Sequence, residues 1–77
     1  RLVEVLRVRR EEHGVRARDV VGAIAGEADI PGRAIGGIEI LKDRTIVEVS
    51  TPYVEQVLGR MRRFRMRGHW ATLYRID

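Results

Sequence analysis

The sequence predicts an α+β fold of the ferredoxin-like type, a βαββαβ sandwich with a four-stranded antiparallel sheet and two helices on one face. Residues 38–49 contain two short stretches of alternating apolar and charged side chains, separated by the polar turn Lys42-Asp43-Arg44. This pattern is typical of an antiparallel hairpin with one buried face. The segments before and after the hairpin carry apolar residues at helical spacing. We therefore expect one sheet face to be covered and the other to be open to solvent.

The first strand is expected at residues 2–10. Leu6 and Val8 alternate there with Arg7 and Arg9. Because successive side chains of a strand point to opposite faces, the two apolar residues should face the core and the two arginines the open side.

A helix is expected from residue 16 or 17 to about residue 28. Asp19 would lie in its first turn, where a carboxylate interacts favourably with the helix dipole. Gly22 and Gly26 lower the helix propensity, and glycines at this spacing often allow a close approach to a sheet. The apolar stripe consists of Val20, Val21, Ile24, Ala25 and Ala28.

The second helix should start at Ser50-Thr51-Pro52, with Thr51 as the N-cap and Pro52 at the first helical position. A last strand is expected at residues 69–76, with Ala71 and Leu73 on the inner face. Trp70, Thr72 and Tyr74 then lie on the outer face. The buried stripe of the second helix consists of Tyr53, Val54, Val57, Leu58 and Met61.

Length and composition indicate a single domain over residues 1–77. The absence of cysteine excludes disulfides and thiolate metal sites. Two lone histidines, His13 and His69, do not make a metal site. No apolar run approaches the roughly 20 residues that cross a bilayer, and the N-terminal residues do not resemble a signal peptide. We expect a cytoplasmic domain without membrane contact.

Fourteen of the fifteen basic residues are arginine, and asparagine is absent. The planar guanidinium group suits phosphates and stacks on flat rings. A hot or GC-rich source would also favour this composition. The two interpretations are compatible.

Residues 60–74 combine arginines with aromatic side chains. Single-stranded RNA requires both, because cations bind phosphates and flat rings stack on bases. The alternative is a solvated arginine loop whose rings close the core. Trp70 and Tyr74 are expected to point outward, whereas both placements remain open for Phe64. The residues concerned are Arg60, Arg62, Arg63, Phe64, Arg65, Arg67, Trp70 and Tyr74.

Other basic residues give weaker signals. Five basic residues come from two strands that the fold makes neighbours, so they could form one patch, or could be solubilising charges paired with glutamates. They are Arg7, Arg9, Arg10, Lys42 and Arg44, of which Arg7, Lys42 and Arg44 are the stronger candidates. Arg33 lies in a Pro-Gly loop, and Arg16 or Arg18 lies at the start of the first helix, where side chains and backbone donors could together hold a phosphate. His69, beside Trp70, could stack on or donate to RNA, or play no part.

Four segments also carry a resemblance to a known family. They are residues 19–25 (Asp-Val-Val-Gly-Ala-Ile-Ala), 30–40 (Ile-Pro-Gly-Arg-Ala-Ile-Gly-Gly-Ile-Glu-Ile), 47–49 (Val-Glu-Val) and 66–68 (Met-Arg-Gly). In order and spacing, residues 16–76 resemble the C-terminal RNA-binding domain of DbpA-type DEAD-box RNA helicases. The arginine-rich composition would suit a thermophilic member of that family.

The resemblance implies a divergent RNA recognition motif that tethers a helicase core, in cis, to structured RNA during ribosome assembly. The implied partner is a 23S-type ribosomal RNA hairpin, and the isolated domain is expected to be a monomer. No phosphate-binding G-x-x-x-x-G-K-[ST] motif or Asp-Glu-Ala-Asp run occurs, so we expect no catalysis and no cofactor in this chain. The ATPase would belong to the parent protein.

The chain departs from ordinary RNA recognition motifs, whose inner strands present aromatic rings to bases. Arg7, Arg44 and Ile46 occupy those positions here. Binding is therefore expected to move towards the edge strand, the loops and the helix ends. The predicted RNA-binding residues are Arg7, Arg33, Lys42, Arg44, Arg63, Phe64, Arg65, Arg67, His69, Trp70 and Tyr74.

Two other functions are compatible with the same fold. An acylphosphatase-like hydrolase would use the loop at residues 14–18 as an anion cradle, although the missing asparagine argues against it. A protein-docking or ligand-sensing module would have an apolar sheet face and would associate independently of salt.

Overall fold

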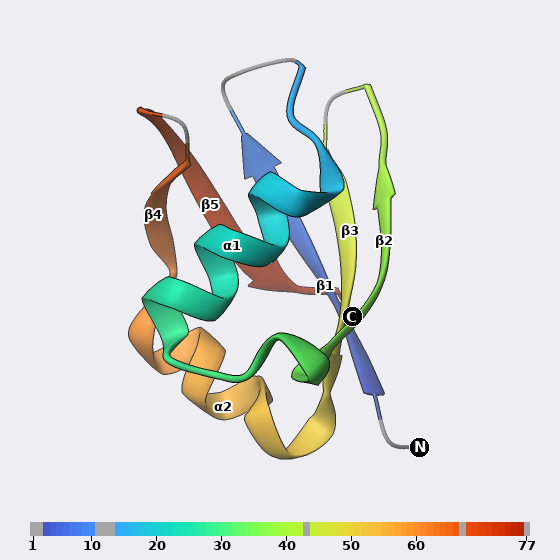
Figure 1. Ribbon diagram of the computed structural model, residues 1–77, viewed down its shortest axis with the longest axis vertical. Coiled ribbons are helices and arrows are strands. Elements are labelled where there is room, and N and C mark those ends of the chain that lie inside the picture. The colour runs from blue at the N-terminus through green and yellow to red at the C-terminus, as the bar shows by residue number, and fades with distance from the viewer. Residues whose placement is uncertain (1–2, 11–13, 43, 67, 77) are drawn as a thin grey trace.

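The computed structural model describes residues 3–10, 14–42, 44–66 and 68–76, and it confirms the α+β class (Figure 1). No helix in these ranges is long and apolar enough to cross a membrane. The elements are β1 (Val3–Arg10), α1 (Ala17–Ala28), the 3₁₀ turn η1 (Gly32–Ala34), β2 (Ile35–Ile40), β3 (Thr45–Ser50), α2 (Thr51–Arg60), β4 (Arg63–Met66) and β5 (His69–Arg75).

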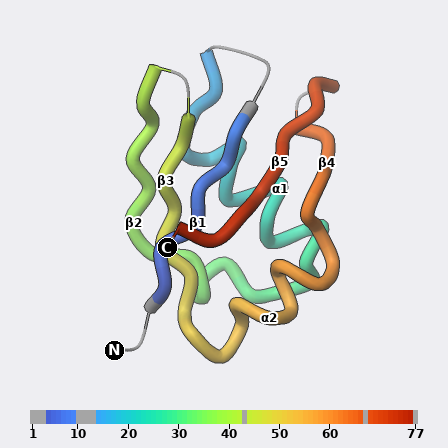
Figure 2. Tube along the Cα trace, turned by 180° about the vertical axis from the view of Figure 1, so that it is seen from behind, coloured from blue at the N-terminus to red at the C-terminus, as the bar shows by residue number. Residues whose placement is uncertain are grey.

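The strands form one antiparallel sheet in the order β2-β3-β1-β5-β4. Strand β1 is central and pairs with β3 on one side and β5 on the other. Both helices lie against the same face of the sheet (Figure 1). The view from behind shows the opposite face without a covering helix (Figure 2).

Within the described residues the sheet has five strands, so the predicted count of four is wrong. The extra strand, β4, lies within the arginine-rich segment and pairs with β5, with Phe64 opposite Ala71 and Arg65 opposite Trp70. The segment can form a strand because Phe64 and Met66 alternate with the arginines, which gives it one apolar face. The turn into β5 uses Gly68, whose φ of 80° is accessible to glycine at little cost.

The core lies between the sheet and the two helices. Leu6, Val8, Val47 and Val49 are fully buried, as the alternation on β1 and β3 predicts. Tyr53 is partly buried against this core. The helices contribute Val20, Ile24 and Ala28 from α1 and Val54, Val57 and Leu58 from α2, all of which belong to the predicted stripes.

The helix starts agree with the sequence to within one residue. The Asp19 carboxylate accepts a hydrogen bond of 2.9 Å from the backbone N–H of Arg16, as a first-turn acid should. In α2 the N-cap is Ser50 rather than the predicted Thr51, and Pro52 is the second helical residue. The shift arises because β3 continues to Ser50 and passes into α2 without a loop.

Gly22 and Gly26 do not serve the close packing that their spacing suggested. Both are exposed, and a Cβ atom built at either position would meet no atom within 4 Å outside the helix's own backbone. The expected approach to the sheet is therefore wrong. These glycines lie on the solvent side of α1.

Matched valine substitutions on β1 test the one-sided burial. Val8→Ala should lower the free energy of unfolding by about 2 to 3 kcal/mol, because it removes buried methyl groups and leaves a cavity. Val5→Ala, on the uncovered face, should cost less than about 1 kcal/mol. Urea denaturation of both variants measures the difference, and equal losses would contradict the assignment of faces.

Glycine substitutions separate backbone strain from packing. Gly22→Ala should stabilise the protein by about 0.5 to 1 kcal/mol, because alanine lowers the entropic cost of the helix. Gly68→Ala should destabilise it by about 1 to 2 kcal/mol, because a side chain disfavours positive φ. A Cβ atom meets no neighbour within 4 Å at either position. Thermal denaturation should show opposite signs, and a shift of the same sign would refute this explanation.

Candidate nucleic-acid interface

The uncovered face of the sheet carries arginines and aromatic rings on neighbouring strands. Its register places Arg7 between Ile46 of β3 and Tyr74 of β5. Thr72 of β5 lies between Arg9 of β1 and Arg63 of β4. All these side chains point away from the helices, because their strand neighbours are buried in the core.

Trp70 is the most accessible ring of this face, with 38% of its surface exposed. The guanidinium carbon of Arg63 lies 4.2 Å from the ring centroid, and that of Arg65 lies 5.3 Å from it. Arg65 also donates a hydrogen bond of 3.1 Å to the carbonyl of Gly68. An exposed ring thus lies beside two cations, and one of them is held by the β4–β5 turn.

A second ring and cation lie further along β5. The guanidinium carbon of Arg7 is 4.9 Å from the ring centroid of Tyr74, and both side chains are half-buried. Arg9 is exposed and completes the row through Thr72 to Arg63. The arginines and rings of three adjacent strands therefore form one positively charged surface, which we call the basic face. It consists of Arg7, Arg9, Arg63, Arg65, Trp70 and Tyr74.

The β2-β3 half of the uncovered face carries two carboxylates, Glu39 and Glu48. Both carboxylates line a hollow of about 250 Å³, together with apolar residues. Glu48 Oε1 accepts a hydrogen bond of 3.1 Å from the N–H of Gly37. A Cβ atom at Gly36 would lie 3.0 Å from the same oxygen, so the glycine pair makes room for this carboxylate. An anionic chain would be attracted to the β1-β5-β4 side and repelled from the β2-β3 side.

The structure brings together one group of the predicted residues and separates others from it. The predicted residues on the basic face are Arg7, Arg63, Arg65, Trp70 and Tyr74. Arg44 is half-buried and lines a hollow with Arg7. His69 is exposed at the start of β5. Arg67 lies outside the described residues.

Arg33 and Lys42 lie apart from the basic face. Arg33 is in η1, which leads directly into Ile35 at the start of β2. Ile35 pairs with Val49, and Val49 pairs with Glu4 near the start of β1. The β4–β5 turn lies at the other end of the sheet (Figure 2). Lys42 is exposed in the connection between β2 and β3. No contact in the described part of the chain joins either residue to the basic face.

Phe64 requires a correction, because its predicted role in stacking on RNA does not fit its position. Only 3% of its surface is exposed, and it belongs to the hydrophobic core. Its pairing with inward-facing Ala71 places it on the helix-covered side of the sheet. The alternation that points Arg63 and Arg65 outward necessarily turns Phe64 inward.

Arg9 and Thr72 are the residues that sequence reasoning undervalued. Alternation had placed Arg9 on the open face, but nothing in the sequence showed the register that aligns it with Thr72 of β5. The pairing of β1 with β5 provides that information. A long-range register of this kind has no local sequence signal.

Comparison with known proteins identifies relatives of the chain. The DbpA RNA-binding domain family matches residues 11–73. A segment of the ATP-dependent RNA helicase DeaD of Haemophilus influenzae is 40% identical over 53 residues, which cover 69% of this chain. The same segment covers 9% of the helicase, so the chain corresponds to a small part of that protein.

A double-mutant cycle tests the contact between Arg63 and Trp70. We expect a coupling energy of about 0.5 to 1 kcal/mol from the Arg63→Ala, Trp70→Ala and double variants, because an exposed cation–π contact has this strength. Arg62→Ala is the control. Arg62 immediately precedes β4, so it is out of phase with Arg63 and Arg65, which point outward from the strand. Urea unfolding gives both coupling energies, and a value for Arg63 no larger than that for Arg62 would argue against the contact.

Proposed function

The chain belongs to the DbpA RNA-binding domain family and is an RNA-binding module, and from this premise we propose that its basic face grips single-stranded or looped RNA. The observation that carries the proposal is the array of four arginines and two rings on the uncovered side of β1, β5 and β4. In this proposal the arginines bind phosphates and the rings stack on unpaired bases.

The charge distribution supports phosphate binding. Arg9, Arg63 and Arg65 are exposed, and among the described residues the carboxylates that line the uncovered face, Glu39 and Glu48, lie on β2 and β3. Arginine contacts to RNA phosphates release counterions, so affinity should fall as salt rises. A protein-docking module would need an apolar sheet face, whereas this face is charged.

The ring positions support base stacking on β5. Arg7 and Ile46 occupy the middle of β1 and β3, where ordinary RNA recognition motifs carry rings. Trp70 and Tyr74 lie on the neighbouring strand, on the same face. We propose that the stacking surface has moved by one strand towards the β4 edge. Each base stacked on an aromatic side chain contributes about 1 to 3 kcal/mol.

We further propose that the module serves a larger helicase. The relative from Haemophilus influenzae is an ATP-dependent RNA helicase, and the chain covers only 9% of its length. Here the module would tether a helicase core in cis, which would supply the ATPase. Structured RNA, such as a 23S-type ribosomal RNA hairpin with unpaired loop bases, is the proposed target.

Substitutions on the basic face test this function. Arg65→Gln should weaken all RNAs about threefold to tenfold and reduce the slope of log affinity against log salt by about 0.7, because one phosphate contact is lost. Trp70→Leu should cost about 1 to 3 kcal/mol with looped or single-stranded RNA and much less with duplex. Anisotropy of fluorescently labelled hairpin, duplex and single-stranded RNAs at two salt concentrations gives these values.

Arg18→Gln is the matched control, because Arg18 is exposed on α1, on the helix-covered side of the sheet. It makes the same change in net charge as Arg65→Gln and should alter affinity less than twofold. If all three variants bind every RNA as the wild type does, the basic face is not the RNA-binding surface.

A further inference from the structure

A row of four side chains crosses the uncovered face from β5 to β2. The strand registers align Tyr74 with Arg7, Arg7 with Ile46, and Ile46 with Glu39. The row therefore runs from a ring through a cation and an aliphatic side chain to a carboxylate. Neighbouring strands lie about 4.8 Å apart, so the cation and the carboxylate stand about 10 Å from each other.

The carboxylate end of this row borders the hollow of about 250 Å³ on the β2-β3 side. Val5 lies opposite Glu48 in the pairing of β1 with β3. The described lining combines three aliphatic side chains, two carboxylates and a glycine: Val5, Ile38, Ile46, Glu39, Glu48 and Gly37. A ligand in the hollow meets aliphatic surface and hydrogen-bond acceptors together.

The carboxylate of Glu48 is fixed in position by the backbone of β2. Its Oε1 accepts a hydrogen bond of 3.1 Å from the N–H of Gly37. A Cβ atom would lie 3.0 Å from this oxygen at Gly36 and 3.3 Å from it at Gly37, so the two glycines leave the space that the carboxylate occupies. A carboxylate has about four lone-pair sites on its two oxygens, and one hydrogen bond therefore leaves accepting capacity for a ligand.

Ionised carboxylates accept hydrogen bonds and donate none, so the edge of a matching base must carry donors. Proteins read unpaired RNA bases by their Watson–Crick edges. On that edge guanine places two donors side by side, N1–H and the N2 amino group. Adenine, cytosine and uracil each place an acceptor beside the donor, and a carboxylate repels that acceptor. Among the four bases, guanine is the one that fits two carboxylates.

We propose that this hollow is a guanine subsite for the RNA strand bound on the basic face, and this inference rests on the proposed RNA-binding function. The base packs on Ile46 and Val5, and its N1–H and N2 amino group donate to Glu48 and Glu39. Its phosphate lies at Arg7, whose guanidinium carbon is 4.9 Å from the Tyr74 ring centroid. A guanidinium stacked on a ring keeps its planar fork of N–H donors for a phosphate.

The two carboxylates also orient the strand. They repel phosphates, so the RNA backbone stays on the β1-β5-β4 side while a base edge with donors reaches the β2-β3 side. The charge division of the uncovered face thus becomes a means of selecting one base.

The experiment uses a labelled heptauridylate and two versions with guanosine or inosine at the central position, measured by fluorescence anisotropy. Inosine keeps N1–H but lacks the N2 amino group. The wild type should bind the guanosine version about fivefold to fiftyfold more tightly than heptauridylate, with the inosine version between them, because a base contact through two hydrogen bonds discriminates to about this extent.

Three variants remove the acceptors in different ways. Glu48→Gln and Glu39→Gln should each reduce the guanosine preference to less than about threefold, without weakening heptauridylate. Gly36→Ala keeps all charges, but its Cβ displaces Glu48 Oε1 and should reduce the preference similarly. The control is Glu27→Gln, which makes the same charge change at an exposed position of α1 and should keep the wild-type preference.

The subsite is overturned if the wild type binds the three heptanucleotides within twofold of one another. It is also overturned if Glu48→Gln and Gly36→Ala keep the wild-type preference, or if they weaken all three heptanucleotides by the same factor. Failure of the wild type to bind any RNA would instead refute the proposed function, and the subsite with it.

Discussion

Each inner strand of the sheet turns one side towards two helices and the other towards water, and the alternation of side chains along the strands must match that division. Leu6, Val8, Val47, Val49 and Leu73 occupy the covered side with almost no exposed surface. A slip of one residue in any pairing would move an apolar set into water. The same requirement fixes the other side, because every position between two core residues must point outward.

The short strand β4 extends this logic to the edge of the sheet. An arginine run in a loop would spread its charges in many directions. Pairing with β5 instead buries Phe64 and Met66 and aligns Arg63 and Arg65 on the side that carries Trp70. Burial of two apolar side chains therefore orients two cations, and the geometry of the candidate interface depends on the packing of the core beneath it.

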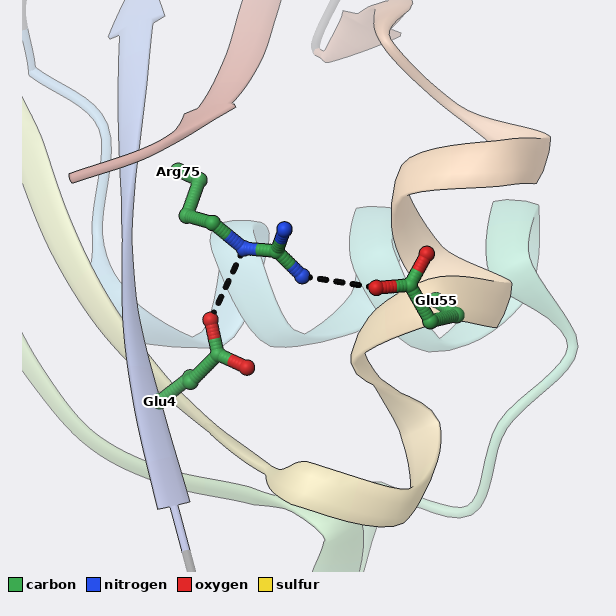
Figure 3. Close-up of polar contacts among 3 residues, drawn as sticks. All are labelled: Glu4, Glu55 and Arg75. Carbon is green, nitrogen blue, oxygen red and sulfur yellow. Dashed lines mark hydrogen bonds and ion pairs between the residues drawn. The ribbon is translucent and has the colours of Figure 1, made fainter. Parts of the chain in front are cut away.

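Polar contacts refine the face that burial has created. Glu48 is held over Gly37 on β2, which keeps its negative charge on the side away from β5. Arg75 is held by Glu4 and Glu55 (Figure 3), so the end of β5 is anchored on the helix side of the sheet. The exposed face consequently has a positive half and a negative half, and a polyanion can lie on it in few orientations.

The sequence by itself determined the α+β class, the two helices, the hairpin and the outward placement of Trp70, because these depend on local periodicity. It did not determine the strand count or the burial of Phe64, since an arginine run with two apolar residues does not show whether a partner strand is available. It also misplaced the N-cap of α2 by one residue, because β3 runs directly into that helix. Only the tertiary structure decided which cations meet which rings. Arg7 contacts Tyr74 although 66 positions separate them, and Arg9 is aligned with Arg63 through Thr72. Such contacts follow from strand order and register, which are properties of the assembled sheet and leave no mark on any single stretch of the chain.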